Sequence, residues 1–146
     1  MAKVVFSCRV SRALLDQARD AVYWLQGPPE FLTLAGLTAN ALQRMVEAVA
    51  KEHGEIPPRP QGEQAGHQGR RAGKTDAPRR TVHSVLVEPE LREAVWNAAH
   101  FLKGEQELAE LVEDGLAREL RSLRRKHGAF EPRPTDAALQ PGRRLK

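Results

Sequence analysis

An internal duplication restricts the folds that this sequence can adopt. The segment KEHGEIPPRP, residues 51–60, returns as RKHGAFEPRP, residues 125–134. The identical pairs are His53/His127, Gly54/Gly128, Pro58/Pro132, Arg59/Arg133 and Pro60/Pro134. A repeated sequence indicates a structural unit that occurs more than once and buries its apolar surface against the neighbouring copy.

The duplication extends toward the N-terminus over most of the chain. Residues 33–54 align with residues 107–128, and residues 5–27 align with residues 82–104. The first copy has a short insertion after Gly27, and insertions collect in loops. A unit of about fifty residues can barely bury a core alone, so we expect the copies to share one. The predicted organisation is a first repeat at 3–54, a linker at 55–79, a second repeat at 80–128 and a tail at 129–146.

Each copy is predicted to form one strand followed by two helices. Apolar and polar residues alternate at the start of each copy, which is the period of a half-buried strand. Apolar residues then recur at helical spacing and give each helix one apolar face. Ser11 is expected to cap the first helix, and Pro89 to start its counterpart. The expected helix ends are at Gly27, Gly54, Gly104 and Gly128.

The segments that follow each copy have the composition of flexible chain. Residues 55–79 and 129–146 are rich in proline, glycine and charge and contain few apolar residues. Such segments cannot bury enough apolar surface to fold. We therefore expect a flexible linker and a disordered basic tail.

Two copies of this unit complete each other. A single strand has nothing to pair with, whereas two strands can form an antiparallel ribbon while four helices close a common core. The expected fold is therefore mainly α, with a two-stranded antiparallel ribbon plus four helices. The sequence leaves open whether the strands pair within one chain or between two chains.

This pattern resembles the ribbon-helix-helix DNA-binding superfamily. The resemblance is carried by the strand VVFSCRVS at 4–11, by TVHSVLVEP at 81–89, and by the helix-glycine-helix pattern after each. Because members of that superfamily are normally homodimers, the resemblance implies a tandem pseudo-dimer in one chain. The exits HGEIPPRP and HGAFEPRP, together with the helices before them, also look like small ParB-type centromere-binding proteins of plasmid partition systems.

The outward side chains of such a ribbon are the candidate base contacts. A two-stranded ribbon fits the major groove of B-DNA, where those side chains meet base edges. Arginine binds guanine, serine donates or accepts hydrogen bonds, and valine or leucine touches thymine methyl groups. The apolar positions could instead meet a protein. The predicted base contacts are Val5, Ser7, Arg9, Val82, Ser84 and Leu86.

Phosphate contacts are expected beside the ribbon. In the superfamily that the chain resembles, the start of the second helix holds a phosphate, because free N–H groups and the helix dipole favour an anion there. Thr33 is expected to cap that helix in the first copy, but its counterpart is Glu107, whose carboxylate would repel a phosphate. We therefore expect the two halves to hold DNA unequally. The predicted phosphate contacts are Arg12, Thr33, Arg70, Arg71, Arg79 and Arg80.

These features favour a sequence-specific binder of double-stranded DNA. The resemblance implies a plasmid centromere-binding protein that acts with a ParA-type ATPase and self-associates along DNA, or an autoregulatory transcriptional repressor of the same fold. The alternative is a helical protein-interaction module with Trp24, Trp96 and Phe101 on its docking face. We expect no enzyme, because the carboxylates between Glu107 and Asp114 fit the exposed face of a helix.

Charge and cysteine content bound the partner and the compartment. The 23 Lys and Arg residues against 19 Asp and Glu give a net charge of +4 at pH 7, which favours an acidic partner such as nucleic acid. Cys8 is the single cysteine, so no internal disulfide can form, and it makes no zinc-like spacing with histidines. No apolar run suffices for a membrane span. We expect a cytoplasmic protein associated with the nucleoid or a plasmid, without metal or cofactor.

Overall fold

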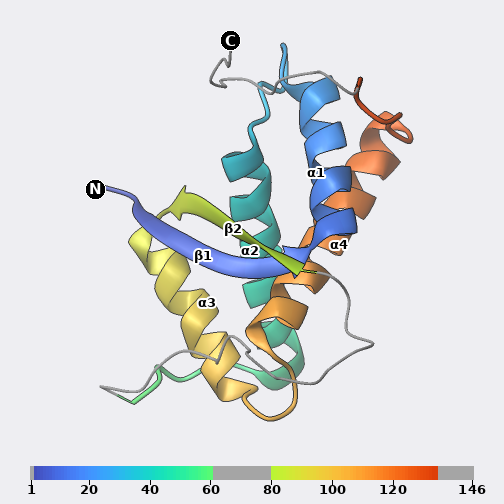
Figure 1. Cartoon of the computed structure of the whole chain (residues 1–146). Coiled ribbons are helices and arrows are strands. Elements are labelled where there is room, and N and C mark those ends of the chain that lie inside the picture. Colours follow the sequence, from blue (N-terminus) through green and yellow to red (C-terminus); the bar gives the residue numbers. More distant parts are fainter. Residues whose placement is uncertain (1, 61–79, 135–146) are drawn as a thin grey trace.

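The chain folds as a strand, two helices, a second strand and two more helices (Figure 1). The computed structural model describes residues 2–60 and 80–134. This arrangement confirms the prediction of a mainly helical chain with a two-stranded antiparallel sheet and four helices in the described residues. The elements are β1 (Val4–Ser11), α1 (Arg12–Leu25), α2 (Leu34–His53), β2 (Arg80–Val87), α3 (Pro89–Phe101) and α4 (Leu108–His127).

The two strands pair with each other within one chain, which answers the question that the sequence left open. They run antiparallel, and Ser7 lies opposite Ser84 at the middle of the ladder. These serines occupy the same position in the two copies, so the register is centred on equivalent residues. The ribbon is therefore built symmetrically from the two copies.

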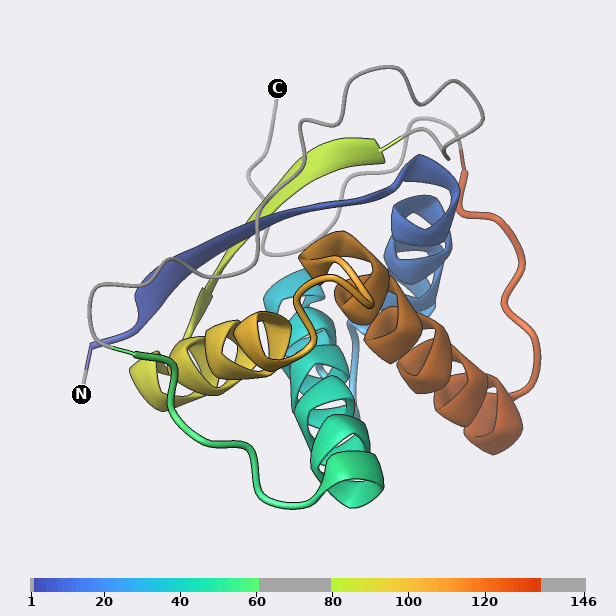
Figure 2. The same ribbon diagram turned by 90° about the horizontal axis from the view of Figure 1, so that it is seen from below.

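The ribbon covers one side of the helices, as the view from below shows (Figure 2). Its inner side chains alternate with the exposed ones, as expected for a half-buried strand, and they enter a core shared by both copies. The helices α2 and α4 pack against each other beneath the ribbon. The largest fully buried apolar side chains are Phe6, Val10, Leu15, Val22, Leu37, Leu42, Val87, Val95, Val112, Leu116 and Leu120.

Local signals place most of the helix ends. The Ser11 side chain caps α1 by accepting a hydrogen bond from the backbone N–H of Leu14 at 3.3 Å, and Pro89 begins α3. The helices α2 and α4 end at their histidines, and Gly54 and Gly128 follow with φ of 87° and 88°. With ψ values of −170° and 175°, both glycines lie in a backbone region that only glycine reaches readily. The first helices stop shortly before the predicted glycines.

The helices α2 and α4 approach each other closely at Gly115. A Cβ atom at this position would overlap the carbonyl oxygen of Ala41 on α2. Ala41 and Gly115 align in the two copies, so the contact joins equivalent points of α2 and α4. Small residues at such a crossing allow two helix backbones to come together.

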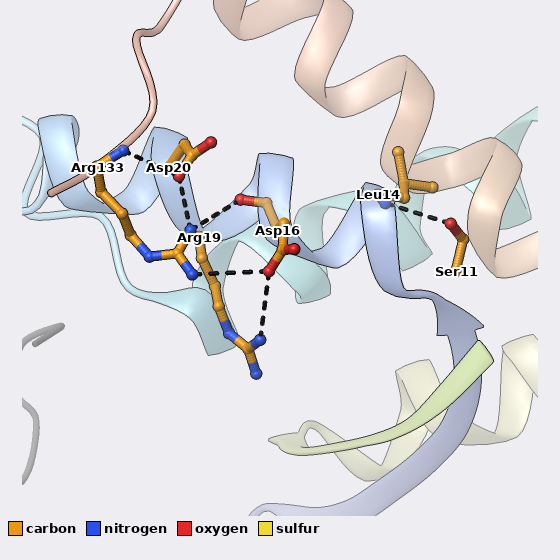
Figure 3. A network of polar contacts seen from close by, with 6 residues as sticks. All are labelled: Ser11, Leu14, Asp16, Arg19, Asp20 and Arg133. Carbon is orange, nitrogen blue, oxygen red and sulfur yellow. Dashed lines mark hydrogen bonds and ion pairs between the residues drawn. The ribbon is translucent and has the colours of Figure 1, made fainter. Parts of the chain in front are cut away.

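The repeated ending of each copy folds back onto the first helix of the other copy. The backbone N–H and the Nη1 of Arg133 donate to Asp20 Oδ1 on α1 at 3.1 and 2.6 Å (Figure 3). In the same way, the backbone N–H and the Nη1 of Arg59 donate to Asn97 Oδ1 on α3 at 3.1 and 2.8 Å. Asp20 and Asn97 align in the duplication. We call residues 58–60 and 132–134 the Pro-Arg-Pro segments.

A second carboxylate completes each of these contacts. Glu93 lies 3.0 Å from Arg59 Nη1, and its aligned counterpart Asp16 lies 3.6 Å from Arg133 Nη2. A flexible linker was expected from residue 55 and a disordered tail from residue 129. Instead, residues 55–60 and 129–134 lie against the helices, and Ile56 and Phe130 pack at the edge of the core. The sequence pattern missed this because the partners of each segment lie in the other copy.

Replacing Arg133 by alanine should lower the free energy of unfolding by about 1–2 kcal/mol, because the charge-assisted hydrogen bonds to Asp20 are only partly exposed to solvent. Urea denaturation followed by circular dichroism measures this. Arg125→Ala is the matched control, since Arg125 is exposed on α4 and makes no ion pair among the described residues. Equal stability of the two variants would show that the segment does not hold the fold.

Candidate nucleic-acid interface

The outer face of the ribbon consists of the six side chains that the sequence assigned to base contacts. The polar members are all exposed, and the exposed fractions of the apolar ones are 56 % for Val5, 60 % for Val82 and 53 % for Leu86. Apolar side chains of this size gathered on one surface indicate a binding face. The six residues are Val5, Ser7, Arg9, Val82, Ser84 and Leu86.

The register sets the geometry of this face. At its centre the Oγ atoms of Ser7 and Ser84 are 2.7 Å apart and share a hydrogen bond. Val5 lies opposite Leu86 on one side of the serines, and Arg9 lies opposite Val82 on the other. The face is therefore three pairs long, with hydroxyl groups in the middle and apolar groups toward both ends.

Arg9 carries the only full charge among these six side chains. Its guanidinium makes no hydrogen bond or ion pair with any other described residue, and its side chain points away from the core. A guanidinium presents five donors in a planar fork, which matches the acceptors O6 and N7 of guanine. Its donors are therefore available to a ligand in the described structure.

Glu113 on α4 anchors one end of the ribbon. Its carboxylate accepts from the backbone N–H of Ser11 at 2.7 Å and from Arg80 Nε and Nη2 at 2.9 and 3.1 Å. The side-chain hydrogen bond to Glu113 raises the pKa of Arg80. The sequence assigned Glu113 to an exposed helix face, but the structure places it against the ribbon. No local pattern reveals this role, because its partners are distant in sequence.

A buried histidine connects the middle of the ribbon to α2. His83 Nε2 is 3.0 Å from Thr38 Oγ1, and both side chains are buried. Burial, together with the nearby charge of Arg19, lowers the pKa of His83, so the imidazole is held neutral. On the same inner face, burial raises the pKa of Cys8 to about 12, as expected for a thiol that serves as a core side chain.

The predicted phosphate contacts fall in different surroundings. Arg12 is exposed at the start of α1. Thr33 caps α2 as predicted, and its Oγ1 accepts from the Gly36 backbone N–H at 3.0 Å. The guanidinium of Arg80 is held by Glu113, so it is not free to bind phosphate as the sequence had suggested. Three further predicted contacts lie outside the described residues: Arg70, Arg71 and Arg79.

The starts of the two second helices differ chemically, as expected from the sequence. At α4, Glu107 and Glu110 form a capping box, in which Glu110 Oε1 accepts from the Glu107 backbone N–H at 3.1 Å. The start of α4 therefore carries two carboxylates, whereas the start of α2 carries the neutral hydroxyl of Thr33. The positive end of the α4 dipole is therefore screened by its own side chains.

The three aromatic residues proposed for a protein-docking face all contact other residues of the fold, but they differ in solvent exposure. Two guanidinium groups lie over the Trp96 ring, those of Arg59 and Arg92, at 5.2 and 4.6 Å from its centroid. Trp24 is 48 % exposed, but its Nε1 donates to the backbone oxygen of Glu131 at 2.7 Å. Phe101 stays 41 % exposed and packs edge-on against His53. These side chains belong mainly to the contacts between the two copies.

Residues 2–60 and 80–134 contain neither a cluster of metal ligands nor a membrane-spanning helix. No group of three or more His, Cys, Asp or Glu side chains there is arranged to hold a metal ion. None of the helices in these ranges has both the length and the apolar character needed to cross a membrane.

Comparison with family models, with curated proteins and with solved structures finds no match to this chain. The outer face of the ribbon and the residues around it are therefore the features that bear on function.

Proposed function

We propose that this chain is a tandem ribbon-helix-helix protein that binds double-stranded DNA sequence-specifically, with its ribbon in the major groove. The observation that carries the proposal is the exposed outer face of the ribbon, where Arg9 is unpaired among the described residues. An α-helix or a two-stranded ribbon fits the width of the major groove, whereas a flat surface does not. The proposed role is binding rather than catalysis.

The chemistry of the outer face suits base edges. The central serines can exchange their mutual hydrogen bond for bonds to bases, because a hydroxyl both donates and accepts. In the proposed complex, Val5, Val82 and Leu86 would meet thymine methyl groups. A protein partner would also accept the apolar side chains, but it would not require the unpaired guanidinium beside them.

The surroundings of the ribbon support backbone contacts. Thr38 of α2 and Glu113 of α4 both contact the ribbon from near the starts of their helices, so these N-terminal ends lie on the ribbon side of the molecule (Figure 2). The start of α2, capped by Thr33, has N–H groups and a dipole that favour a phosphate. Arg12 adds an exposed cation close to the end of β1.

DNA binding should be steeply salt-dependent and should depend on Arg9. Counterion release predicts a linear fall of log affinity with log salt concentration. Arg9→Ala should weaken binding to a specific duplex by roughly 1–3 kcal/mol, because a bidentate contact to guanine is lost. Mobility-shift titrations of duplexes enriched from a random pool measure both quantities. Arg125→Ala, remote from the ribbon on α4, is the control for the loss of one positive charge.

Two results would contradict the proposal. One is the absence of duplex binding at low salt, which would favour a protein-interaction module. The other is an Arg9→Ala variant that binds every enriched duplex as tightly as the Arg125→Ala control does. That result would place the binding surface away from the ribbon.

For the biological role we propose plasmid partition, in which the chain binds a centromere-like site and acts with a ParA-type ATPase. The support is the resemblance of the helix-glycine-helix pattern and its HG…P exits to ParB-type proteins. Autoregulatory repression uses the same DNA contacts and is the second candidate. A ParA-like gene beside the coding sequence favours partition, and binding confined to the chain's own promoter favours repression. Self-association along DNA belongs to the partition proposal, as does association with the nucleoid or a plasmid.

A further inference from the structure

The two ends of the ribbon are equivalent by position but not by chemistry. Because Ser7 and Ser84 face each other and align in the duplication, the ends on either side of them correspond. Val5 at one end matches Val82 at the other. Arg9, however, matches Leu86. One end therefore presents a guanidinium beside a valine, and the other presents a leucine beside a valine.

The two ends of the ribbon also differ in the side chains that hold them against the helices. Glu113 holds the Arg9 end by bonding to Ser11 and Arg80. The residue that aligns with Glu113 in the first copy is Ala39, which has no polar side chain; the opposite end instead receives a hydrogen bond from Arg92 Nη1 on α3 to the backbone oxygen of Val5 at 3.3 Å. The ribbon end that carries Arg9 is thus held against α4 by charge-assisted hydrogen bonds, which fix the backbone from which the Arg9 side chain extends.

We propose that the DNA target of this chain is not palindromic. This inference rests on the proposed function and assigns a different base preference to each half of the site. The half that meets Arg9 and Val82 contains a guanine read through O6 and N7. The half that meets Val5 and Leu86 is read through thymine methyl groups and contains no arginine-bound guanine.

The physical reason lies in the fusion of two copies in one chain. A homodimer has two identical ends, so its site mirrors the two-fold symmetry of the protein. In this chain the strands come from different segments of sequence, and a change such as Arg9 against Leu86 affects one end alone. Fusion therefore removes the requirement for a symmetric site while keeping the symmetric framework of the ribbon.

The test begins with selection of binding sites from randomised duplexes by the full chain. The wild-type protein should select a sequence whose two halves differ, with a guanine required in one half. Replacing that base pair should lower affinity roughly 5- to 150-fold. The dyad-related base pair in the other half should not show a requirement for guanine. Fluorescence anisotropy with labelled duplexes measures both effects.

Three variants with substitutions on the exposed face then test the assignment. Arg9→Leu gives both ends the same apolar side chains and should lose the requirement for guanine. Leu86→Arg gives both ends an arginine and should select a palindrome with guanine in both halves. The double variant R9L/L86R has the wild-type composition and should regain the single guanine requirement. Thermal unfolding is measured alongside to confirm that each variant is folded.

The outcomes separate this inference from the proposed function. A palindromic wild-type site would overturn the inference and leave DNA binding intact, as would an Arg9→Leu variant that still requires the guanine. A Leu86→Arg variant that selects the same asymmetric site as the wild type would also overturn it. Failure of the wild-type chain to bind any duplex at low salt would overturn the proposed function itself.

Discussion

Replacing Gly115 by alanine is expected to lower the free energy of unfolding by about 2 kcal/mol. Alanine favours a helix over glycine by about 1 kcal/mol, so propensity alone would predict stabilisation. The added Cβ, however, overlaps the Ala41 carbonyl oxygen and lies 3.1 Å from Met45 Cβ. A backbone cannot turn aside as a flexible side chain can, and overpacking typically costs about 1–3 kcal/mol. The helices must therefore separate, and the packing that both copies share is lost along their length.

Gly27→Ala is the control for this substitution. A Cβ at Gly27 meets nothing within 4 Å, so its stability should change by no more than about 0.5 kcal/mol. Equilibrium denaturation in urea compares the two variants. A Gly115→Ala protein at least as stable as the wild type would mean that α2 and α4 do not cross as closely as described.

Replacing Arg44 by methionine should lower the free energy of unfolding by about 2–3 kcal/mol. Arg44 Nε donates to Glu119 Oε1, and the Glu119 side chain is only 7 % exposed. The other hydrogen bond that Glu119 accepts, from Asn40 Nδ2, is long at 3.5 Å. Removing one partner of a buried pair costs about 3–5 kcal/mol. Arg44 is 45 % exposed, which lets water replace part of its contribution and places the estimate below that range.

The duplication supplies both the control and the rescue for this prediction. Arg118 aligns with Arg44, but it is exposed and makes no hydrogen bond or ion pair among the described residues, so Arg118→Met should be close to neutral. Met45 aligns with Glu119, so the double variant R44M/E119M places an apolar residue where the first copy has one. The double variant should recover most of the stability lost by Arg44→Met. Failure to recover would show that the Arg44 side chain stabilises the fold independently of Glu119.

The outer face of the ribbon could be predicted because it depends on short-range pattern alone. In a strand, successive side chains point to opposite faces, so the apolar run of Phe6, Cys8 and Val10 fixes the direction of Arg9. The duplication added the order of elements and the matching of Ser7 with Ser84. Neither step required knowledge of any distant contact.

The contacts that join the two copies could not be predicted in this way. The composition of residues 55–60 and 129–134 indicates flexible chain, yet Arg59 and Arg133 bind helices of the opposite copy. Glu113 has the spacing of an exposed helix residue, but it holds the end of the ribbon. In each case the partner is remote in sequence, and a local pattern carries no information about which distant residue comes near.

The repeated unit, the helical and strand segments and the outward side chains of the ribbon can all be read from the sequence alone. These follow from periodicity and capping, which act over a few residues. Three features depend on contacts in the folded chain: the strands pair within one chain, Arg80 is held by Glu113 instead of being free, and each Pro-Arg-Pro segment binds the other copy. Burial and charge pairing between distant segments stabilise one tertiary arrangement over others that the local sequence pattern permits equally well.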